Sequence, residues 1–212
     1  MGTCVSEERT VPMFPLGTVL LPGSVLPLQV FEPRYLQMLA DLEEQQNDRF
    51  GVVLIERGSE VGGGEVRTDV GTEAVIAGAR PLDGGRVAVL AVGGRRIAVQ
   101  RWLDDDPYPR AVVTDRPDQG DPPSPHDIEP VTGRLRRLRG LLSELGAALG
   151  NADVDLHSDL GVATWQIAAA VGAGPLDLQR LLRIDDPRAR LEAVDQIVID
   201  ATDLAEARLA GG

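Results

Sequence analysis

A proline-rich, acidic segment, Asp115 to Asp127, divides this sequence of 212 residues into two halves with different periodicity. The segment contains almost no apolar side chain, which is typical of a linker. Before it, short apolar runs alternate with Gly and Pro turns, as in strands; after it, apolar residues recur every three or four positions, as in helices. We therefore expect an α+β protein with a flexible tail (1–9), a β-rich subdomain (10–114), a linker (115–127) and a helical subdomain (128–212).

Prolines restrict how the strands of the first half can pair. Positions 12, 15, 22 and 27 are proline, which has no N–H to donate to a ladder, so these strands should lie at edges, bends or the rim of a small barrel. A strand over Val25 to Phe31 should lead into one short helix that starts at Pro33. The other predicted strands form an antiparallel meander with glycine turns at Asp83-Gly84-Gly85 and Gly93-Gly94. They are Thr10–Leu16, Phe50–Ile55, Val70–Ala79, Arg86–Val92, Arg95–Leu103 and Arg110–Thr114, with a hairpin loop at Gly58–Gly64.

The second half contains four helix patterns. The longest should begin after an N-cap at Asp127 and carries an apolar stripe from Ile128 to Leu149. Two shorter helices should follow, one with Leu160 on its apolar face and one capped by Asp177. A final helix should start at Pro187, since proline suits the first helical position. We expect these helices to form a small bundle.

The residue types that are missing exclude several kinds of chemistry. All 21 basic residues are arginine, so no lysine can serve a Walker A loop, a Ser/Lys dyad or a Schiff base. Cys4 is the sole cysteine, and neither of the two histidines has a suitably spaced partner for zinc. We therefore predict no catalytic residue, no metal site and no cofactor.

Hydropathy and charge indicate the cellular location of the protein and the partners that it disfavours. No apolar run approaches the ~18 residues that a membrane-spanning helix needs, and no secretory signal pattern is present. The formal net charge of -12 disfavours nucleic acid and anionic membranes as partners. We expect a cytoplasmic protein that does not bind membranes.

Two groups of residues near the start of the chain are candidate functional or structural sites. Leu20, Leu21 and Pro22 lie at a turn, where an exposed apolar patch could contact a polypeptide; the alternative is that Leu20 and Leu21 fold inward. The second group should build the corner between strand and helix, with Glu32 either pairing with Arg34 or capping the helix. It comprises Phe31, Glu32, Pro33, Arg34 and Tyr35.

The order of several short motifs resembles the N-terminal substrate-binding domain of Lon proteases. The motifs are Phe14-Pro15-Leu16, Leu21-Pro22-Gly23, Leu26-Pro27-Leu28, Phe31-Glu32-Pro33-Arg34-Tyr35, Phe50–Ile55, Val70-Gly71-Thr72, Gly93-Gly94-Arg95-Arg96 and Pro107-Tyr108, with Gln179, Leu181, Leu182 and Arg190-Leu191 in the helical half. The resemblance implies a PUA-like pseudobarrel followed by a helical bundle. It also implies binding of unfolded or tagged polypeptides, with a protease complex as a further partner.

The resemblance does not extend to the Lon enzyme. A complete Lon protease continues into an ATPase module and a Ser/Lys peptidase, whereas this sequence has no Walker motif and no lysine. We therefore expect a non-catalytic recognition module that acts as an adaptor or regulator of proteolysis. The alternative is an RNA-binding PUA-like module that uses the basic cluster Arg134, Arg136, Arg137 and Arg139, although the net charge opposes it.

Overall fold

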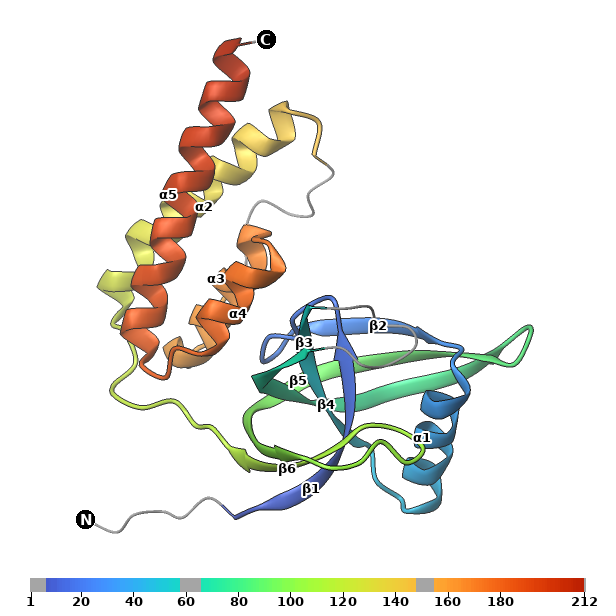
Figure 1. The fold of residues 1–212 in the computed structure, drawn as a ribbon. Helices are drawn as coiled ribbons and strands as arrows, with labels where there is room; N and C mark the ends of the chain where they lie inside the picture. Colours follow the sequence, from blue (N-terminus) through green and yellow to red (C-terminus); the bar gives the residue numbers. More distant parts are fainter. Residues whose placement is uncertain (1–6, 58–65, 148–154, 212) are drawn as a thin grey trace. The chain divides into compact units, whose positions relative to one another are not determined.

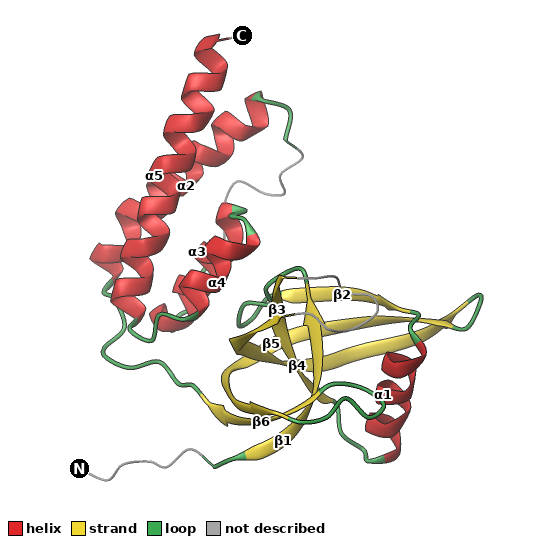
Figure 2. Cartoon of the chain, viewed as in Figure 1, coloured by secondary structure: helices red, strands yellow, loops and turns green. Residues whose placement is uncertain are grey.

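The computed structural model describes residues 7–57, 66–147 and 155–211, which form two compact units. The N-terminal unit ends at Pro117 and the C-terminal unit begins at Asp118, so the boundary falls inside the proposed linker. Strands and one helix make up the first unit and four helices the second (Figures 1 and 2), which confirms the α+β class. Most of the proposed tail, and the predicted loop at Gly58–Gly64, lie outside the described residues. Arg9 already belongs to the first strand.

The N-terminal unit is a six-stranded sheet with one helix. Its elements are β1 (Arg9–Leu16), β2 (Val25–Val30), α1 (Pro33–Glu44), β3 (Arg49–Arg57), β4 (Val66–Leu82), β5 (Arg86–Trp102) and β6 (Arg110–Asp115). The strand order is β2-β5-β4-β3-β1-β6, and β5 also pairs with β6. The pairings therefore form a closed ring through β5, β4, β3, β1 and β6. Strand β2 lies outside this ring, on β5.

Strand β5 differs most from the sequence-based expectation. The sequence predicted two strands with a turn at Gly93-Gly94, but β5 runs without interruption through both glycines. Its first half pairs with β2 and its second half with β6. A glycine is needed at position 93 because a Cβ there would lie 2.2 Å from the carbonyl oxygen of Leu21. The meander prediction holds for β3, β4 and β5, whereas β1 pairs with β3 in parallel.

Helix α1 begins at Pro33, as predicted, and buries Tyr35, Met38 and Leu42. The Tyr35 ring stacks on Phe14 of β1, with 4.0 Å between the ring centroids. Phe50 of β3 completes this aromatic group at 6.1 Å from Phe14. One face of the helix therefore joins the larger apolar core of the N-terminal unit.

One buried carboxylate connects the strands of the ring. Glu73 of β4 is 3% exposed and pairs with Arg9 of β1 at 2.9 Å, Arg49 of β3 at 3.0 Å and Arg95 of β5 at 2.9 Å. Arg9 and Arg95 also pair with Asp115 of β6. Each of the five ring strands thus contributes one charged residue to this network, which we call the Glu73 network.

The arginines control the ionisation of Glu73. Burial alone would raise the pKa of Glu73, but hydrogen bonds from Arg9 and Arg49 and the charges of Arg9 and Arg95 lower it, and the pKa lies below its usual value of 4.5. The ionised form is therefore more favourable in the folded protein than in the unfolded chain. This contribution to stability is present above pH 4.5 and is lost as the pH falls through the folded-state pKa.

Replacement of Glu73 tests this network. We expect Glu73→Gln to lower the free energy of unfolding at pH 7 by about 2 kcal/mol, because charge-assisted hydrogen bonds are lost. The difference from wild type should shrink as the pH falls below 4.5, since glutamine does not titrate. Urea unfolding at several pH values measures both effects. Glu56→Gln, at an exposed position of β3, is the control, and a Glu73→Gln effect that does not change with pH would contradict the pKa argument.

The C-terminal unit consists of α2 (Pro125–Glu144), α3 (Leu160–Val171), α4 (Pro175–Leu182) and α5 (Pro187–Gly211). Helix α2 begins earlier than predicted, because Ser124 is the N-cap and Asp127 sits at the third helical position of a capping box. It ends at Glu144, whereas the sequence stripe continued to Leu149, which lies outside the described residues. Helix α5 starts at Pro187, as predicted.

A buried arginine holds the C-terminal unit together. Arg190 of α5 is 0% exposed, and its guanidinium lies 3.6 Å from the centre of the Trp165 ring of α3. It donates to both carboxylate oxygens of Asp118, at 2.9 and 2.6 Å, and to Thr164 Oγ1 at 2.9 Å. The carbonyl oxygens of Gly161 and Ile184 are further acceptors. Arg190 therefore joins the segment before α2 to α3, to the end of α4 and to α5.

Removal of this guanidinium should destabilise the C-terminal unit. We expect Arg190→Met to lower the free energy of unfolding by about 3 kcal/mol, because it breaks a buried ion pair and leaves acceptors unpaired. Arg180→Met is the matched control, since Arg180 is 80% exposed and its pair with Asp177 should contribute less than ~1 kcal/mol. Urea unfolding followed by circular dichroism in the far ultraviolet, which reports mainly on the helices, measures both variants. Equal effects of the two substitutions would contradict the assignment.

Candidate functional site

The structure places the predicted contact leucines in the interior. Leu20 and Leu21 are 3% and 2% exposed, and Pro22 is half-buried. The carbonyl of Leu20 accepts a hydrogen bond from the buried hydroxyl of Thr72 at 2.5 Å, and the Leu21 carbonyl lies over Gly93. The prediction of an exposed leucine patch was therefore wrong, and the inward alternative is correct.

The predicted corner is present, but without Phe31. Arg34 pairs with Glu32 at 3.0 Å and its guanidinium lies 4.6 Å from the centre of the Tyr35 ring. Glu32 is the N-cap residue of α1 but makes no side-chain cap hydrogen bond, so the ion-pair alternative is the correct one. Phe31 is 56% exposed, because Val30 before it points into the core and successive side chains of an extended chain alternate.

Phe31 belongs instead to an exposed apolar surface. Val25 is 60% exposed and Leu90 is 46% exposed, and Pro27 of β2 lies directly opposite Leu90 of β5. We call Val25, Pro27, Phe31 and Leu90 the outer apolar face. The sequence contained a signal for it, since Val25, Pro27, Gln29 and Phe31 alternate with the inward residues Leu26, Leu28 and Val30.

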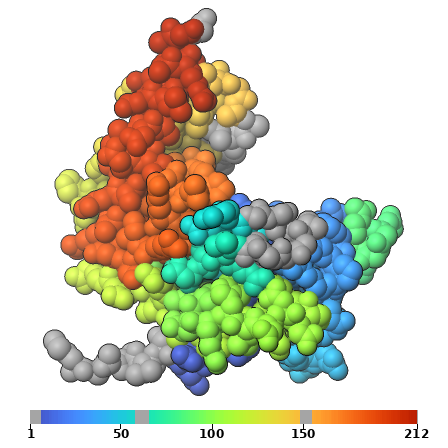
Figure 3. All heavy atoms as spheres, in the orientation of Figure 1, coloured from blue at the N-terminus to red at the C-terminus, as the bar shows by residue number. Residues whose placement is uncertain are grey.

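Two shallow hollows adjoin the outer apolar face and share Pro27 and Leu28. The first hollow has a volume of about 410 Å³ and spreads across the three neighbouring strands β2, β5 and β4. It is lined by Pro27, Leu28, Gly78, Ala79, Arg80, Ala88, Val89 and Leu90, of which Arg80 is the one charged residue. The second, of about 170 Å³, lies between β1, β2 and the start of α1. It is lined by Phe14, Leu16, Pro27, Leu28, Gln29, Val30, Phe31, Glu32 and Tyr35. Beside the first hollow, the β4–β5 hairpin projects beyond β2 and α1 (Figures 1 and 3).

Residues 10–200 match the family model described as the ATP-dependent protease La (LON) substrate-binding domain. The chain belongs to this family. The Lon resemblance of the sequence is thereby confirmed. The family assigns this Lon substrate-binding domain a substrate-recognition role, and neither an ATPase domain nor a protease domain is found in it.

Individual relatives agree with this membership. The Lon protease of Koribacter versatilis (strain Ellin345) is 24% identical over 217 residues, which cover 96% of this chain and 25% of that protein. The chain thus spans about a quarter of the length of that relative. The crystal structure of a Lon N-terminal domain protein from Xanthomonas campestris is 30% identical, with a TM-score of 0.65 over 87% of this chain and 95% of that one. The N-terminal domain of Mycobacterium avium complex Lon protease shares the fold, with 17% identity, a TM-score of 0.59 and coverage of 91% and 99%.

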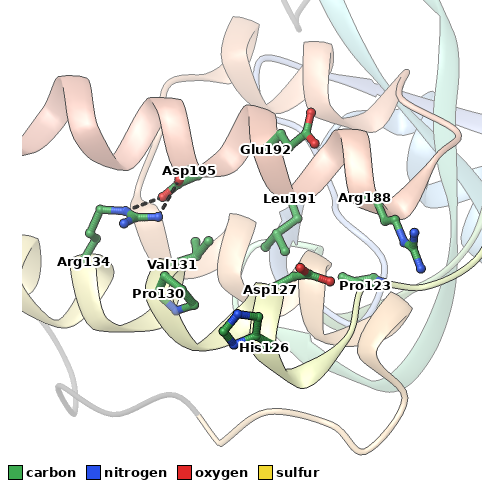
Figure 4. Close-up of a pocket in the computed structure, with 10 residues that line it drawn as sticks. All are labelled: Pro123, His126, Asp127, Pro130, Val131, Arg134, Arg188, Leu191, Glu192 and Asp195. Atoms are coloured by element: carbon green, nitrogen blue, oxygen red, sulfur yellow. Dashed lines mark hydrogen bonds and ion pairs between the residues drawn. The ribbon is translucent and has the colours of Figure 1, made fainter.

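The C-terminal unit of this Lon substrate-binding domain contains a more polar groove of about 530 Å³ between α2 and α5 (Figure 4). Several of its charged groups already have partners. Arg134 makes two hydrogen bonds to Asp195, at 2.7 and 2.6 Å, and Asp127 accepts from the backbone N–H and hydroxyl of Ser124. These hydrogen bonds lower the pKa of Asp127 below its usual value. Arg134, Asp195 and Asp127 are therefore engaged in contacts within the C-terminal unit.

The basic cluster on α2 is also engaged within the unit. Besides the Arg134 pair, Arg137 pairs with Glu206 at 2.6 Å, and Arg139 donates to the carbonyl oxygen of Ala170 at 3.1 Å. The arginines are interspersed with carboxylates, so they do not form a continuous positive surface. The RNA-binding alternative is not favoured.

Two features are absent from the described part of the chain. None of its helices is long and apolar enough to cross a membrane. No group of three or more His, Cys, Asp or Glu side chains within the described ranges is arranged to hold a metal ion.

The different burial of two leucines gives a direct test of the site assignment. We expect Leu21→Asp to lower the free energy of unfolding of the N-terminal unit by more than ~3 kcal/mol, because it buries an unpaired carboxylate and removes a core side chain. Leu90→Asp, which places the same charge at an exposed position, should change it by less than ~1 kcal/mol. Thermal or urea unfolding by circular dichroism compares the two. A stable Leu21→Asp variant would contradict the burial of this turn.

Proposed function

We propose that this Lon substrate-binding domain binds exposed apolar segments of polypeptides through the outer apolar face. The observation that carries the proposal is the concentration of Val25, Pro27, Phe31 and Leu90 on neighbouring strands, beside two hollows. Contiguous apolar surface of this kind on a soluble protein usually marks a contact site. The family supplies the general role of substrate recognition, and the outer apolar face supplies a surface for it.

The chemistry of this face favours unfolded over folded clients. Large apolar side chains are buried in folded proteins and become accessible when the chain unfolds. The one carboxylate in the smaller hollow, Glu32, is paired with Arg34, so it does not add an uncompensated charge. An apolar side chain that enters either hollow would bury surface worth about 25 cal/mol per Å².

We further propose that recognition is the whole role of these 212 residues, as an adaptor or regulator of proteolysis. A sequence without lysine offers neither the phosphate-binding lysine of a Walker loop nor the lysine of a Ser/Lys peptidase. The PUA-like class of the N-terminal unit remains part of the proposal. The closed ring of β5, β4, β3, β1 and β6 supports it.

Binding of an unfolded protein tests the proposal. Reduced, carboxymethylated lactalbumin should bind the wild-type chain in fluorescence anisotropy titrations, and native lactalbumin should not. Leu90→Asp and Phe31→Ser should each weaken binding about tenfold or more, since each removes a side chain worth ~1.5 kcal/mol or more of apolar burial. The matched control is Leu176→Asp on α4, because Leu176 is 62% exposed but lies in the other unit.

Two results would contradict the proposal. One is the absence of binding by the wild-type chain at high micromolar concentration. The other is an equal loss of affinity in Leu90→Asp and Leu176→Asp, which would show that any exposed leucine contributes and that the outer apolar face has no special role.

A further inference from the structure

We propose that the bound segment pairs with the outer edge of β2 as an additional strand, so that main-chain hydrogen bonds and apolar side chains act together. This inference rests on the proposed function, which supplies the polypeptide ligand. It adds the conformation of the ligand, which is extended, and the part of the protein that holds its backbone. The occupant is a segment of another polypeptide with large apolar residues at alternate positions.

The pairing register shows which backbone groups of β2 point outward. Pro27 lies opposite Leu90 of β5, and because proline has no N–H this must be a non-hydrogen-bonded pair. The neighbouring residues Leu26 and Leu28 therefore direct their backbone groups to β5. Val25, Pro27 and Gln29 direct theirs to the opposite edge. The hydrogen bond from the Gly93 N–H to the Ser24 carbonyl, at 2.9 Å, fits the same alternation.

Within the described residues, these outward groups have no hydrogen-bond partner. Strand β5 is the one pairing partner of β2 in the described sheet, and the described residues make no hydrogen bond to the outward groups of Val25, Pro27 or Gln29. All three residues are exposed to solvent. An exposed strand edge with unpaired donors and acceptors is a template for another extended chain. The row offers two N–H donors, from Val25 and Gln29, and the proline between them offers a carbonyl oxygen alone.

The smaller hollow lies on this open side of β2. Its lining includes no residue of β5 but includes Phe14 and Leu16 of β1. Strand β6 pairs with β1 only as far as Pro12, so the hollow begins where that pairing stops. Its volume of about 170 Å³ suits about one large apolar side chain.

An added strand would use both apolar features at once. Its side chains alternate between the two faces of the sheet. One set would lie beside Val25, Pro27 and Phe31 on the outer apolar face, and the other would point to the hollow over the buried rings of Phe14 and Tyr35. The backbone contacts would be independent of sequence, whereas the hollow would select a large apolar residue at one position.

Position 27 disfavours a second copy of this chain as the occupant. An antiparallel pair of β2 strands along their full length would place Pro27 opposite Pro27, where two carbonyl oxygens meet without a donor. A segment of another polypeptide supplies an N–H at that point. Natural edge strands often carry proline for the same reason, since it opposes self-association.

Substitutions at Gln29 separate backbone pairing from side-chain contact. The probe is a fluorescein-labelled peptide that alternates valine or phenylalanine with threonine and ends in arginine. Gln29→Pro removes the outward N–H without removing a bond to β5, and we expect it to weaken binding about 3- to 10-fold. Gln29→Ala removes the side chain, which also lines the smaller hollow, and keeps the N–H. It is therefore the matched control, and Gln29→Pro should bind more weakly than Gln29→Ala. Circular dichroism and thermal unfolding verify that both variants fold.

Methylation of the peptide backbone is an independent test of edge pairing. Two peptides carry N-methyl groups at opposite sets of alternate positions. One should not bind and the other should bind as the unmodified peptide does, because only one edge of the peptide faces β2. Hydrogen exchange of the protein is a third test of edge pairing. The Val25 and Gln29 amides should become protected when the peptide binds, whereas the Leu26 and Leu28 amides should be protected already.

The outcomes distinguish this inference from the proposed function. If Leu90→Asp weakens binding while Gln29→Pro and both methylated peptides bind as their controls do, edge pairing is wrong and the outer apolar face stands. If the wild-type chain binds neither the peptide nor unfolded lactalbumin, the proposed function is wrong. If Gln29→Pro converts a dimer to a monomer in sedimentation experiments, the edge serves a second copy and the inference is overturned.

Discussion

The N-terminal unit depends on one buried carboxylate, Glu73, to which each strand of the ring is linked. A closed ring of five strands has a small interior. Each strand must keep its register so that the ring can close between β5 and β6. Arg9, Arg49 and Arg95 reach Glu73 from three other strands, and Asp115 adds the fifth. An ionised carboxylate at 3% exposure is tolerable only because three guanidinium groups surround it. The Glu73 network and the apolar core therefore act together to hold the five ring strands in register.

Closure of the ring has a consequence for β2. Ring strands pair on both sides, so their backbone groups have partners over the paired stretches. In the described sheet, β2 pairs with β5 alone. In the described sheet, β2 thus has one edge without a strand partner along its whole length, beside the exposed side chains of Val25, Pro27 and Phe31. The proposed binding mode follows from this topology, since the same fold that protects five strands leaves the sixth available.

Local patterns in the sequence predicted the elements well, and long-range contacts account for the errors. The prolines placed β2 at an edge, Pro33 marked the start of α1, and the order of short motifs identified the family. The burial of Leu21 depends on Gly93, more than 70 positions away, and a turn at that glycine was the reasonable local expectation. The Glu73 network joins residues between positions 9 and 115, so no local pattern could reveal it. The alternation of inward and outward side chains along β2 would have predicted the exposure of Phe31. The position of this aromatic residue next to a predicted corner suggested instead that it packs there.

The structure shows how this chain uses arginine, its one type of basic residue besides histidine. A lysine presents one ammonium group, whereas a guanidinium offers five donors in a plane and can stack on a ring. Arg190 uses that geometry fully, with contacts to Asp118, Thr164 and two carbonyl oxygens while it covers Trp165. Arg67 likewise holds Asp105 with two hydrogen bonds and lies 4.5 Å from the centre of the Trp102 ring. In a chain with 3% aromatic residues, these branched cations supply connections that large rings would otherwise make. These arginines thus connect elements within each unit, whereas β2, the strand that we propose for recognition, carries no charged residue.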